Sequence, residues 1–117
     1  MITFPQAIAR QEGWLNPNSR CRRNHNPGNI EFGAFARAHG ATANDGVYAV
    51  FPDDATGWAC MHALLMLGYL TLTIAQAITK WAPPETNDTA AYIANVCEWT
   101  GLAPDTVLTL PIIAIAA

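Results

Sequence analysis

The 117-residue sequence has a single serine and three cysteines, and these small numbers exclude several kinds of protein. Ser19 is not surrounded by a Gly-x-Ser-x-Gly turn, which argues against a serine hydrolase. An odd number of cysteines argues against a disulfide framework. Cys60 and Cys97 lie in apolar segments that are typical of a protein core. We therefore expect three free thiols.

Metal and cofactor sites are also missing from the sequence. The histidines show no i, i+4 pair of the kind that binds zinc, and no glycine-rich loop could cradle a phosphate. Cys21 with His39 or His62 could form a thiol–imidazole pair. However, polar residues 22–24 follow this cysteine, where an apolar helix would be needed to hold it rigidly. We expect no metal and no cofactor, and a cysteine peptidase is disfavoured.

Charge is sparse, at 13% of the residues, and unevenly distributed. Residues 1–40 hold five arginines against two glutamates, a balance of +3, whereas residues 41–117 hold one lysine against seven acids, a balance of −6. A basic segment of this kind faces either an anionic polymer or solvent. Arg20, Arg22 and Arg23 are too few for a nucleic-acid surface. We therefore expect no nucleic-acid partner.

Targeting and membrane signals are absent as well. Residues 1–10 lack the basic start and long apolar stretch of a secretory signal. The apolar run 108–117 is too short to span a bilayer, and we interpret it as the last core helix. We therefore expect a protein made in the cytoplasm, without membrane insertion. The length suits a single domain over residues 1–117, and 51% apolar residues can form its core.

The first half of the chain predicts one helix followed by a small sheet. Thr3 can cap a helix with Pro5 in its first turn, running to Glu12 and ending at Gly13. Residues 15–29 have the composition of a loop. Residues 29–32 and 47–51 resemble short strands separated by an Asn-Asp-Gly turn signal, which predicts an antiparallel sheet of two or three strands.

The second half predicts helices. Asp53 or Asp54 can cap a helix ending at Gly68, and Thr73 can cap one from Ile74 to about Trp81. A further helix begins at a cap among residues 87–89 and runs to Thr100. Pro104 is expected to open a final helical segment that Pro111 kinks or breaks. The order predicts an α+β fold that is mainly helical, with a small antiparallel β-sheet after the first helix.

Glu12 is the carboxylate best placed for chemistry. It falls at the end of a mostly buried helix, beside Ile8 and near Trp14. Cleavage of a glycosidic bond needs a carboxyl group that keeps its proton near neutral pH. Apolar neighbours and the negative end of a helix dipole both favour the protonated form, so we expect a raised pKa for Glu12. The alternative is an ordinary solvated glutamate.

The loop at residues 23–30, Arg-Asn-His-Asn-Pro-Gly-Asn-Ile, is the second candidate feature. Pro27 and Gly28 suit the centre of a type II turn. Amides such as those of Asn26 and Asn29 can pair with the hydroxyl and acetamido groups of sugars. The alternative is that these asparagines only cap and turn the backbone.

Four stretches together resemble the lysozyme superfamily, in particular soluble lytic transglycosylases and small phage- and prophage-encoded lysozyme-like proteins. They cover most of residues 6–101: Ala9-Arg10-Gln11-Glu12-Gly13, residues 23–30, residues 47–51, and Trp81-Ala82-Pro83-Pro84 continuing to Tyr92. The resemblance implies a lysozyme-like fold. It also implies cleavage of the β-1,4 bond between N-acetylmuramic acid and N-acetylglucosamine in bacterial peptidoglycan.

The resemblance also implies roles for individual residues. Glu12 matches the general acid, and Glu31 falls where a second catalytic group could face the cleft. Tyr92 resembles a tyrosine that lines the glycan cleft. Tyr48 and Asn87 join Asn26, Asn29 and Tyr92 as candidate substrate-binding residues. The partner would be the glycan strand of peptidoglycan, on which the protein would act after release from the host cell or as part of a virion, and we expect a monomer.

The sequence departs from many phage lysozymes at two positions. These proteins carry an acid and then a threonine at fixed spacing after the glutamate, and here Cys21 and Pro27 hold those places. Hydrolysis and transglycosylation are therefore both open, since a transglycosylase needs only one glutamate. A catalytically inactive module that binds peptidoglycan or builds the virion is the alternative.

Overall fold

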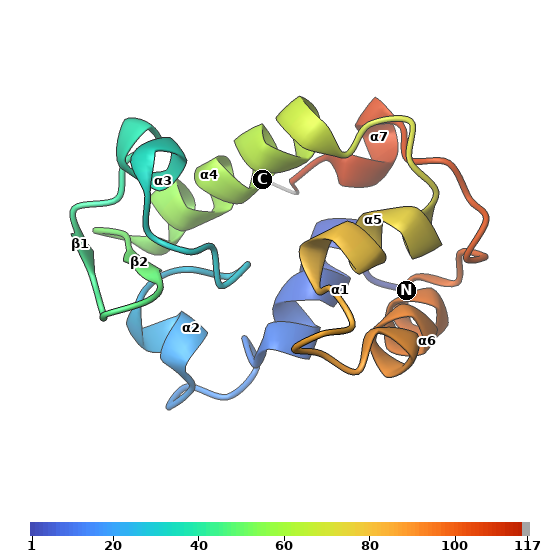
Figure 1. The fold of residues 1–117 in the computed structure, drawn as a ribbon, viewed down its shortest axis with the longest axis horizontal. Coiled ribbons are helices and arrows are strands. Elements are labelled where there is room, and N and C mark those ends of the chain that lie inside the picture. Colours follow the sequence, from blue (N-terminus) through green and yellow to red (C-terminus); the bar gives the residue numbers. More distant parts are fainter. Residues whose placement is uncertain (116–117) are drawn as a thin grey trace.

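The computed structural model describes residues 1–115 as one mainly helical α+β fold with a small two-stranded sheet. Figure 1 shows the sheet, α2 and α3 gathered at one end of the molecule, with α5, α6 and α7 at the other. The elements are, in order, α1 (Phe4–Glu12), α2 (Arg20–Arg23), α3 (Ala34–Ala38), β1 (Ala43–Asn44), β2 (Ala49–Val50), α4 (Asp54–Gly68), α5 (Ile74–Trp81), α6 (Thr89–Thr100) and α7 (Leu110–Ile113).

The predicted first helix is confirmed at both ends. The Thr3 hydroxyl accepts from the Gln6 amide at 3.2 Å, and the Gln6 side chain accepts from the Thr3 amide at 3.0 Å. Gly13 ends the helix in the left-handed conformation at φ 106°. Phe4 and Ile8 are fully buried, and α1 packs against α6. This packing fixes the end of α1, where Glu12 lies.

The three helices predicted in the second half are also confirmed. Asp53 caps α4, Thr73 caps α5 and Asp88 caps α6, each accepting a hydrogen bond from a backbone amide in the first turn. Gly101 follows α6 in the left-handed conformation. Local capping signals were sufficient to place these ends because each cap satisfies backbone amides that the helix itself leaves without partners.

An antiparallel sheet of two strands is confirmed, but its strands are shorter than predicted and one of them is a different segment. β1 and β2 pair antiparallel, with Ala43 opposite Val50, and β1 lies outside the two predicted strands. The predicted strand at residues 29–32 contributes an isolated bridge between Glu31 and Tyr48. Side chains alternate between the two faces of a strand, which predicts that Ile30 and Glu31 point in opposite directions. The structure agrees, since Ile30 is buried and Glu31 is exposed.

Two short helices and the final segment differ from the prediction. α2 forms within the predicted loop at 15–29, and α3 was not predicted. The predicted helix after Pro104 is wrong. Leu108 instead exchanges backbone hydrogen bonds with the turn before α5, donating to Leu72 at 2.8 Å and accepting from Thr71 at 3.2 Å. Pro111 lies in the first turn of α7, where its missing amide costs no hydrogen bond. The end of the predicted helix 108–117 lies outside the described residues.

The core lies between α1, α4, α5 and α6. Its fully buried members include Phe4, Phe51, Met61, Leu65 and Ile78. Cys60 belongs to this core as predicted, and the structure describes all three cysteines as free thiols. Among residues 1–115, no helix is long and apolar enough to span a membrane.

Candidate functional site

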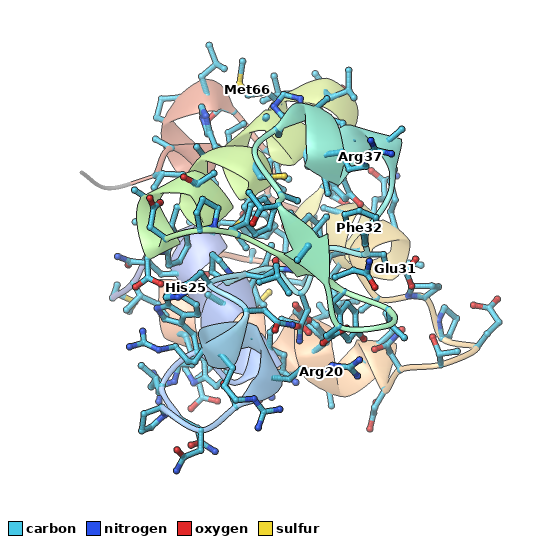
Figure 2. The ribbon with its side chains drawn as sticks, turned by 90° about the vertical axis from the view of Figure 1, so that its left-hand side faces the viewer. Arg20, His25, Glu31, Phe32, Arg37 and Met66 are labelled. Carbon is cyan, nitrogen blue, oxygen red and sulfur yellow. The ribbon has the colours of Figure 1, made fainter. Side chains whose placement is uncertain are left out.

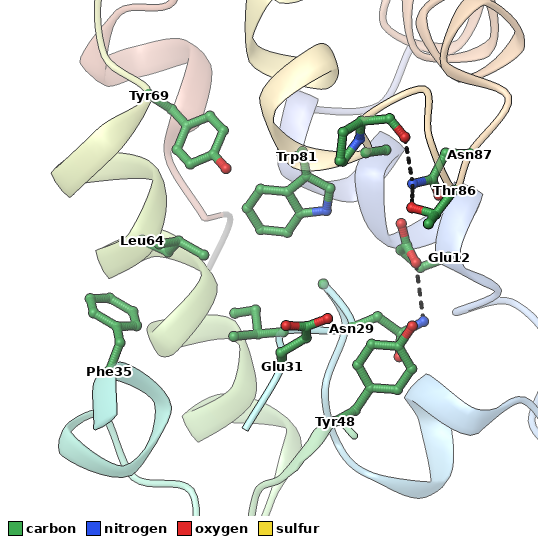
Figure 3. Close-up of a pocket in the computed structure, with 14 residues that line it drawn as sticks. Glu12, Asn29, Glu31, Phe35, Tyr48, Leu64, Tyr69, Trp81, Thr86 and Asn87 are labelled. Atoms are coloured by element: carbon green, nitrogen blue, oxygen red, sulfur yellow. Dashed lines mark hydrogen bonds between the residues drawn. The ribbon is translucent and has the colours of Figure 1, made fainter. Parts of the chain in front are cut away.

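A cleft of about 480 Å³ lies between the sheet end and the helical end of the molecule (Figure 3). One side of the cleft is apolar and is lined by Phe35, Leu64, Tyr69 and Trp81. The other side is polar and is lined by Glu12, Asn29, Glu31, Tyr48, Thr86 and Asn87. The cleft is therefore amphipathic, as binding sites for organic ligands usually are.

Glu12 is the most constrained polar group of the cleft. Its half-buried side chain accepts hydrogen bonds on both oxygens, from Asn29 Nδ2 at 3.1 Å and from the Tyr92 hydroxyl at 2.8 Å. Its backbone carbonyl accepts from the Cys21 thiol at 3.4 Å. α1, α6 and the loop before the sheet thus converge on one carboxylate.

Tyr92 is a buried donor and not the predicted wall of the cleft. Its side chain is only 4% exposed, and it does not line the cleft. Burial, together with the negative charge of Glu12, raises the pKa of Tyr92 well above its usual range. The hydroxyl therefore stays protonated and available to Glu12. The structure therefore places Tyr92 against Glu12 and outside the lining of the cleft, and its contact with substrate stays a prediction.

Asn29 is held in an unfavourable state. Its φ is +47°, in the left-handed region, and its side-chain carbonyl oxygen is buried without a hydrogen-bond partner among the described residues. The predicted type II turn is wrong, because that turn requires a positive φ at Gly28 and the positive φ lies at Asn29. Strain and an unpaired polar atom are frequent at functional sites. Here they accompany the hydrogen bond to Glu12.

Gly28 is needed for space. A Cβ at this position would lie 2.8 Å from Trp81 Cζ2 and 3.1 Å from Met61 Cε, both shorter than normal contacts. The Trp81 ring therefore packs directly on the backbone of the Asn-Pro-Gly-Asn loop. Its other contact is an edge-to-face pair with Tyr69, with ring centroids 5.5 Å apart. These contacts fix the wall of the cleft that carries Trp81.

Asn26, which was predicted to bind substrate, does not line the cleft. The residue is fully buried, and its amide nitrogen donates to the carbonyls of Ile30 at 2.9 Å and Ala49 at 3.0 Å. Its oxygen accepts from the Ile30 amide at 3.0 Å. The side chain replaces backbone pairing between the loop and β2, so it is not available to a sugar.

Glu31, Tyr48 and Asn87 line the cleft. The Glu31 side chain is exposed and, in Figure 3, points into the space between Glu12 and the apolar wall. The Asn87 amide donates to the Pro83 carbonyl and the Thr86 hydroxyl, each at 3.1 Å. The structure thus brings Glu12, Asn29, Glu31, Tyr48 and Asn87 together around one cleft.

The amino-acid sequence did not indicate the apolar wall of the cleft or Thr86. Leu64 and Tyr69 were indistinguishable from core positions, because they occupy the inward side of α4 and its end. Phe35 lies on the unpredicted α3. Trp81 belongs to one of the stretches that resemble the lysozyme superfamily. The two prolines after it, Pro83 and Pro84, were the only sequence signal that the chain bends beside the cleft.

The basic N-terminal third is largely engaged within the molecule. Arg10 lies 4.4 Å from the centre of the Trp99 ring, Arg20 lies 4.6 Å from Tyr48, and Arg22 lies 4.3 Å from Trp14. Cation–π contacts of this kind stabilise local structure. Figure 2 looks onto the end that carries Arg20, Glu31 and Arg37. These contacts account for three of the arginines without an anionic polymer.

No group of three or more histidine, cysteine, aspartate or glutamate side chains within residues 1–115 is arranged to hold a metal ion. The residues of the cleft can donate and accept hydrogen bonds, stack on a flat ligand face, and exchange a proton at Glu12.

No protein-family model matches the chain, and no curated protein matches it. The function is therefore argued from the geometry of the cleft.

Proposed function

We propose that this protein cleaves the glycan strand of bacterial peptidoglycan, with Glu12 as the proton donor. The observation that carries the proposal is the setting of Glu12. Its carboxyl group lies on a cleft at the end of a buried helix, and Asn29 and Tyr92 fix both of its oxygens. A general acid must be held in place in this way to reach the leaving oxygen.

The shape and lining of the cleft support a sugar as the ligand. N-acetylated sugars carry hydroxyl and amide groups at their edges and apolar C–H faces. The polar wall offers Asn87 and Thr86 for the edges, and the apolar wall offers the ring of Trp81 for a face. At about 480 Å³, the cleft falls within the range usual for sites of organic ligands, roughly 300–1,000 Å³.

The proposed reaction begins with proton transfer from Glu12 to the oxygen between two sugars. The bond from this oxygen to the anomeric carbon then breaks, the electron pair stays on the oxygen, and positive charge develops on the carbon. Glu12 becomes a carboxylate, which the hydrogen bonds from Asn29 and Tyr92 stabilise. Either water or the substrate's own 6-hydroxyl group then attacks the carbon and loses a proton.

Glu31 is our candidate for assisting the second half of the reaction. Its exposed carboxylate lines the same cleft as Glu12. As a base it would take the proton from an attacking water molecule, giving hydrolysis. As a negative charge it would only stabilise the developing cation, and attack by the 6-hydroxyl group would then give an anhydro sugar.

Glycan binding without cleavage is the second candidate function. One observation favours it. Both oxygens of Glu12 already accept hydrogen bonds, which suits a carboxylate that binds polar groups and does not donate a proton. The two candidates share the ligand and the cleft. They differ in whether soluble fragments are released.

The test compares the wild-type protein with Glu12→Gln and with Glu98→Gln, which changes an exposed glutamate on α6 away from the cleft. Glu12→Gln keeps the shape of the side chain but cannot donate the proton. We expect wild type and Glu98→Gln to clear a suspension of purified cell walls at equal rates, and Glu12→Gln to bind the walls without clearing them. Equal clearing by all three would exclude Glu12 as the acid. Binding by all three without clearing would favour the second candidate.

A further inference from the structure

A polar cluster outside the cleft surrounds Asp45, which the sequence marks only as a turn residue. Its carboxylate accepts hydrogen bonds from the backbone amides of Val47 at 3.1 Å and Tyr48 at 2.7 Å. It also accepts from Asn24 Nδ2 at 2.8 Å and from both Nε and Nη2 of Arg20, the latter at 2.9 Å. Five donors on one side chain exceed what the turn itself requires.

Arg20 makes a second contact that points toward the cleft. Its guanidinium lies 4.6 Å from the centre of the Tyr48 ring. A planar guanidinium can hold a carboxylate through two parallel N–H groups while its face stacks on an aromatic ring, which lysine cannot do. The charge of Arg20 and the donors around Asp45 hold the pKa of Asp45 well below its usual range. The ion pair therefore persists at all ordinary pH values.

Tyr48 transmits this arrangement to the cleft. Its side chain lines the cleft, and its backbone forms the bridge to Glu31. Neither Arg20 nor Asp45 lines the cleft. Arg20 also belongs to α2, whose Cys21 thiol contacts the backbone of Glu12. α2 thus contacts the end of α1 that carries Glu12 and, through Tyr48, the segment that carries Glu31.

We propose that Arg20 and Asp45 are positioning residues that hold Tyr48 as a rigid wall of the glycan cleft. This inference rests on the proposed function, because it assigns a role in binding the same substrate. Arg20 covers one part of the Tyr48 ring, which leaves the remainder to contact a sugar. Loss of the contacts among Arg20, Asp45 and Tyr48 frees the Tyr48 ring and the β1–β2 hairpin, so the affinity for glycan falls. The proton transfer at Glu12 does not depend on these contacts.

The experiment measures kcat and KM on soluble glycan oligomers for Arg20→Lys, Tyr48→Ala and the double variant, with Arg23→Lys as the control. Arg23 lies on the same helix but is exposed, and within residues 1–115 its side chain makes one hydrogen bond, to the Asn18 carbonyl. We expect Arg20→Lys to raise KM about tenfold with little change in kcat, and Arg23→Lys to change neither. Asp45→Asn, which keeps an oxygen for the turn amides, should resemble Arg20→Lys.

The double variant separates positioning from general destabilisation. If Arg20 acts through Tyr48, adding Arg20→Lys to Tyr48→Ala raises KM no further. Additive effects, or an Arg20→Lys variant indistinguishable from Arg23→Lys, would overturn the proposal. If wild type binds the oligomers without cleaving them, the cleavage function fails, and the same comparison is made on Kd from an NMR titration. Absence of both binding and cleavage by folded wild type would overturn both proposals.

Discussion

Replacing Asn29 by glycine and by alanine separates the chemical role of this residue from its conformational cost. Both changes remove the amide that donates to Glu12 at 3.1 Å, together with the buried oxygen that has no partner in the described structure. They differ in the backbone, because φ at this position is +47°. Glycine adopts this conformation readily, whereas the Cβ of alanine is strained there.

The difference in stability between the glycine and alanine variants follows from the cost of the left-handed conformation and from chain entropy. The left-handed conformation costs a residue with a Cβ about 1–2 kcal/mol. Glycine loses more chain entropy on folding than alanine does, and this loss offsets about 0.5–1 kcal/mol of its conformational advantage. The glycine variant should therefore be more stable by about 1 kcal/mol. A chain of 117 residues has an unfolding entropy of about 0.25 kcal/mol/K, so Tm should differ by about 4 °C.

The stability of Asn29→Gly relative to wild type depends mainly on two opposing side-chain changes, because asparagine tolerates the left-handed conformation better than alanine does and the relief at this φ roughly offsets the chain entropy that glycine loses. A hydrogen bond to a charged group is lost, at a cost of about 1.5–3 kcal/mol. A buried oxygen without a partner is removed, which gains about 1–3 kcal/mol. These changes nearly cancel, so the glycine variant should unfold within about 1 kcal/mol of wild type. Cleavage should fall about tenfold in both variants, since neither can position Glu12 or stabilise its carboxylate.

The assay combines thermal unfolding, followed by circular dichroism, with the rate of glycan cleavage at saturating substrate. Asn26→Ala is the matched control, because that asparagine is buried and pairs only with backbone groups. It should lower Tm sharply and leave the kcat of the folded fraction unchanged. A glycine variant less stable than the alanine variant would contradict the conformational cost at Asn29, and full activity in both would contradict its role in positioning Glu12.

Two further variants test the carboxylates of the cleft. Tyr92→Phe keeps the buried ring and removes one donor to Glu12, so kcat should fall about tenfold. The cleavage rate measures kcat, and circular dichroism checks that the fold is retained. An unchanged kcat would show that this donor is not needed. Because the pKa of Tyr92 is raised, wild type should not lose this donor as the pH rises to about 10. Glu31→Gln should reduce cleavage less than Glu12→Gln does, since transglycosylation needs no second carboxylate. Complete inactivation of a folded Glu31→Gln protein would instead indicate an acid–base pair working by hydrolysis.

Features with a local cause could be predicted from the sequence. The capping box at Thr3 and the glycine after Glu12 gave both ends of α1, and Asp53, Thr73 and Asp88 cap helices where short polar residues precede apolar runs. The alternation along residues 30–32 predicted that Glu31 points away from the core. Each of these signals acts within about four residues, which is the range of a helix turn or a strand pleat.

Features that depend on contacts between distant segments could not be predicted. Tyr92 meets Glu12 across 80 residues of sequence, and nothing near Tyr92 indicates that its hydroxyl is buried. Asn26 and Asn29 have similar neighbours in the sequence. One is used by the backbone of β2, and the other reaches Glu12. The apolar wall of the cleft resembles core because the same residue types form both.

The proposed role of Glu12 is tested most directly by mass analysis of the soluble products that wild type and Glu12→Gln release from purified peptidoglycan. We expect wild type to release short glycan fragments with either a reducing or an anhydro N-acetylmuramic acid end, and a folded Glu12→Gln protein to release none. The type of end distinguishes attack by water from attack by the 6-hydroxyl group. Fragments of the same kind and amount from Glu12→Gln, or no glycan fragments from folded wild type, would contradict this role.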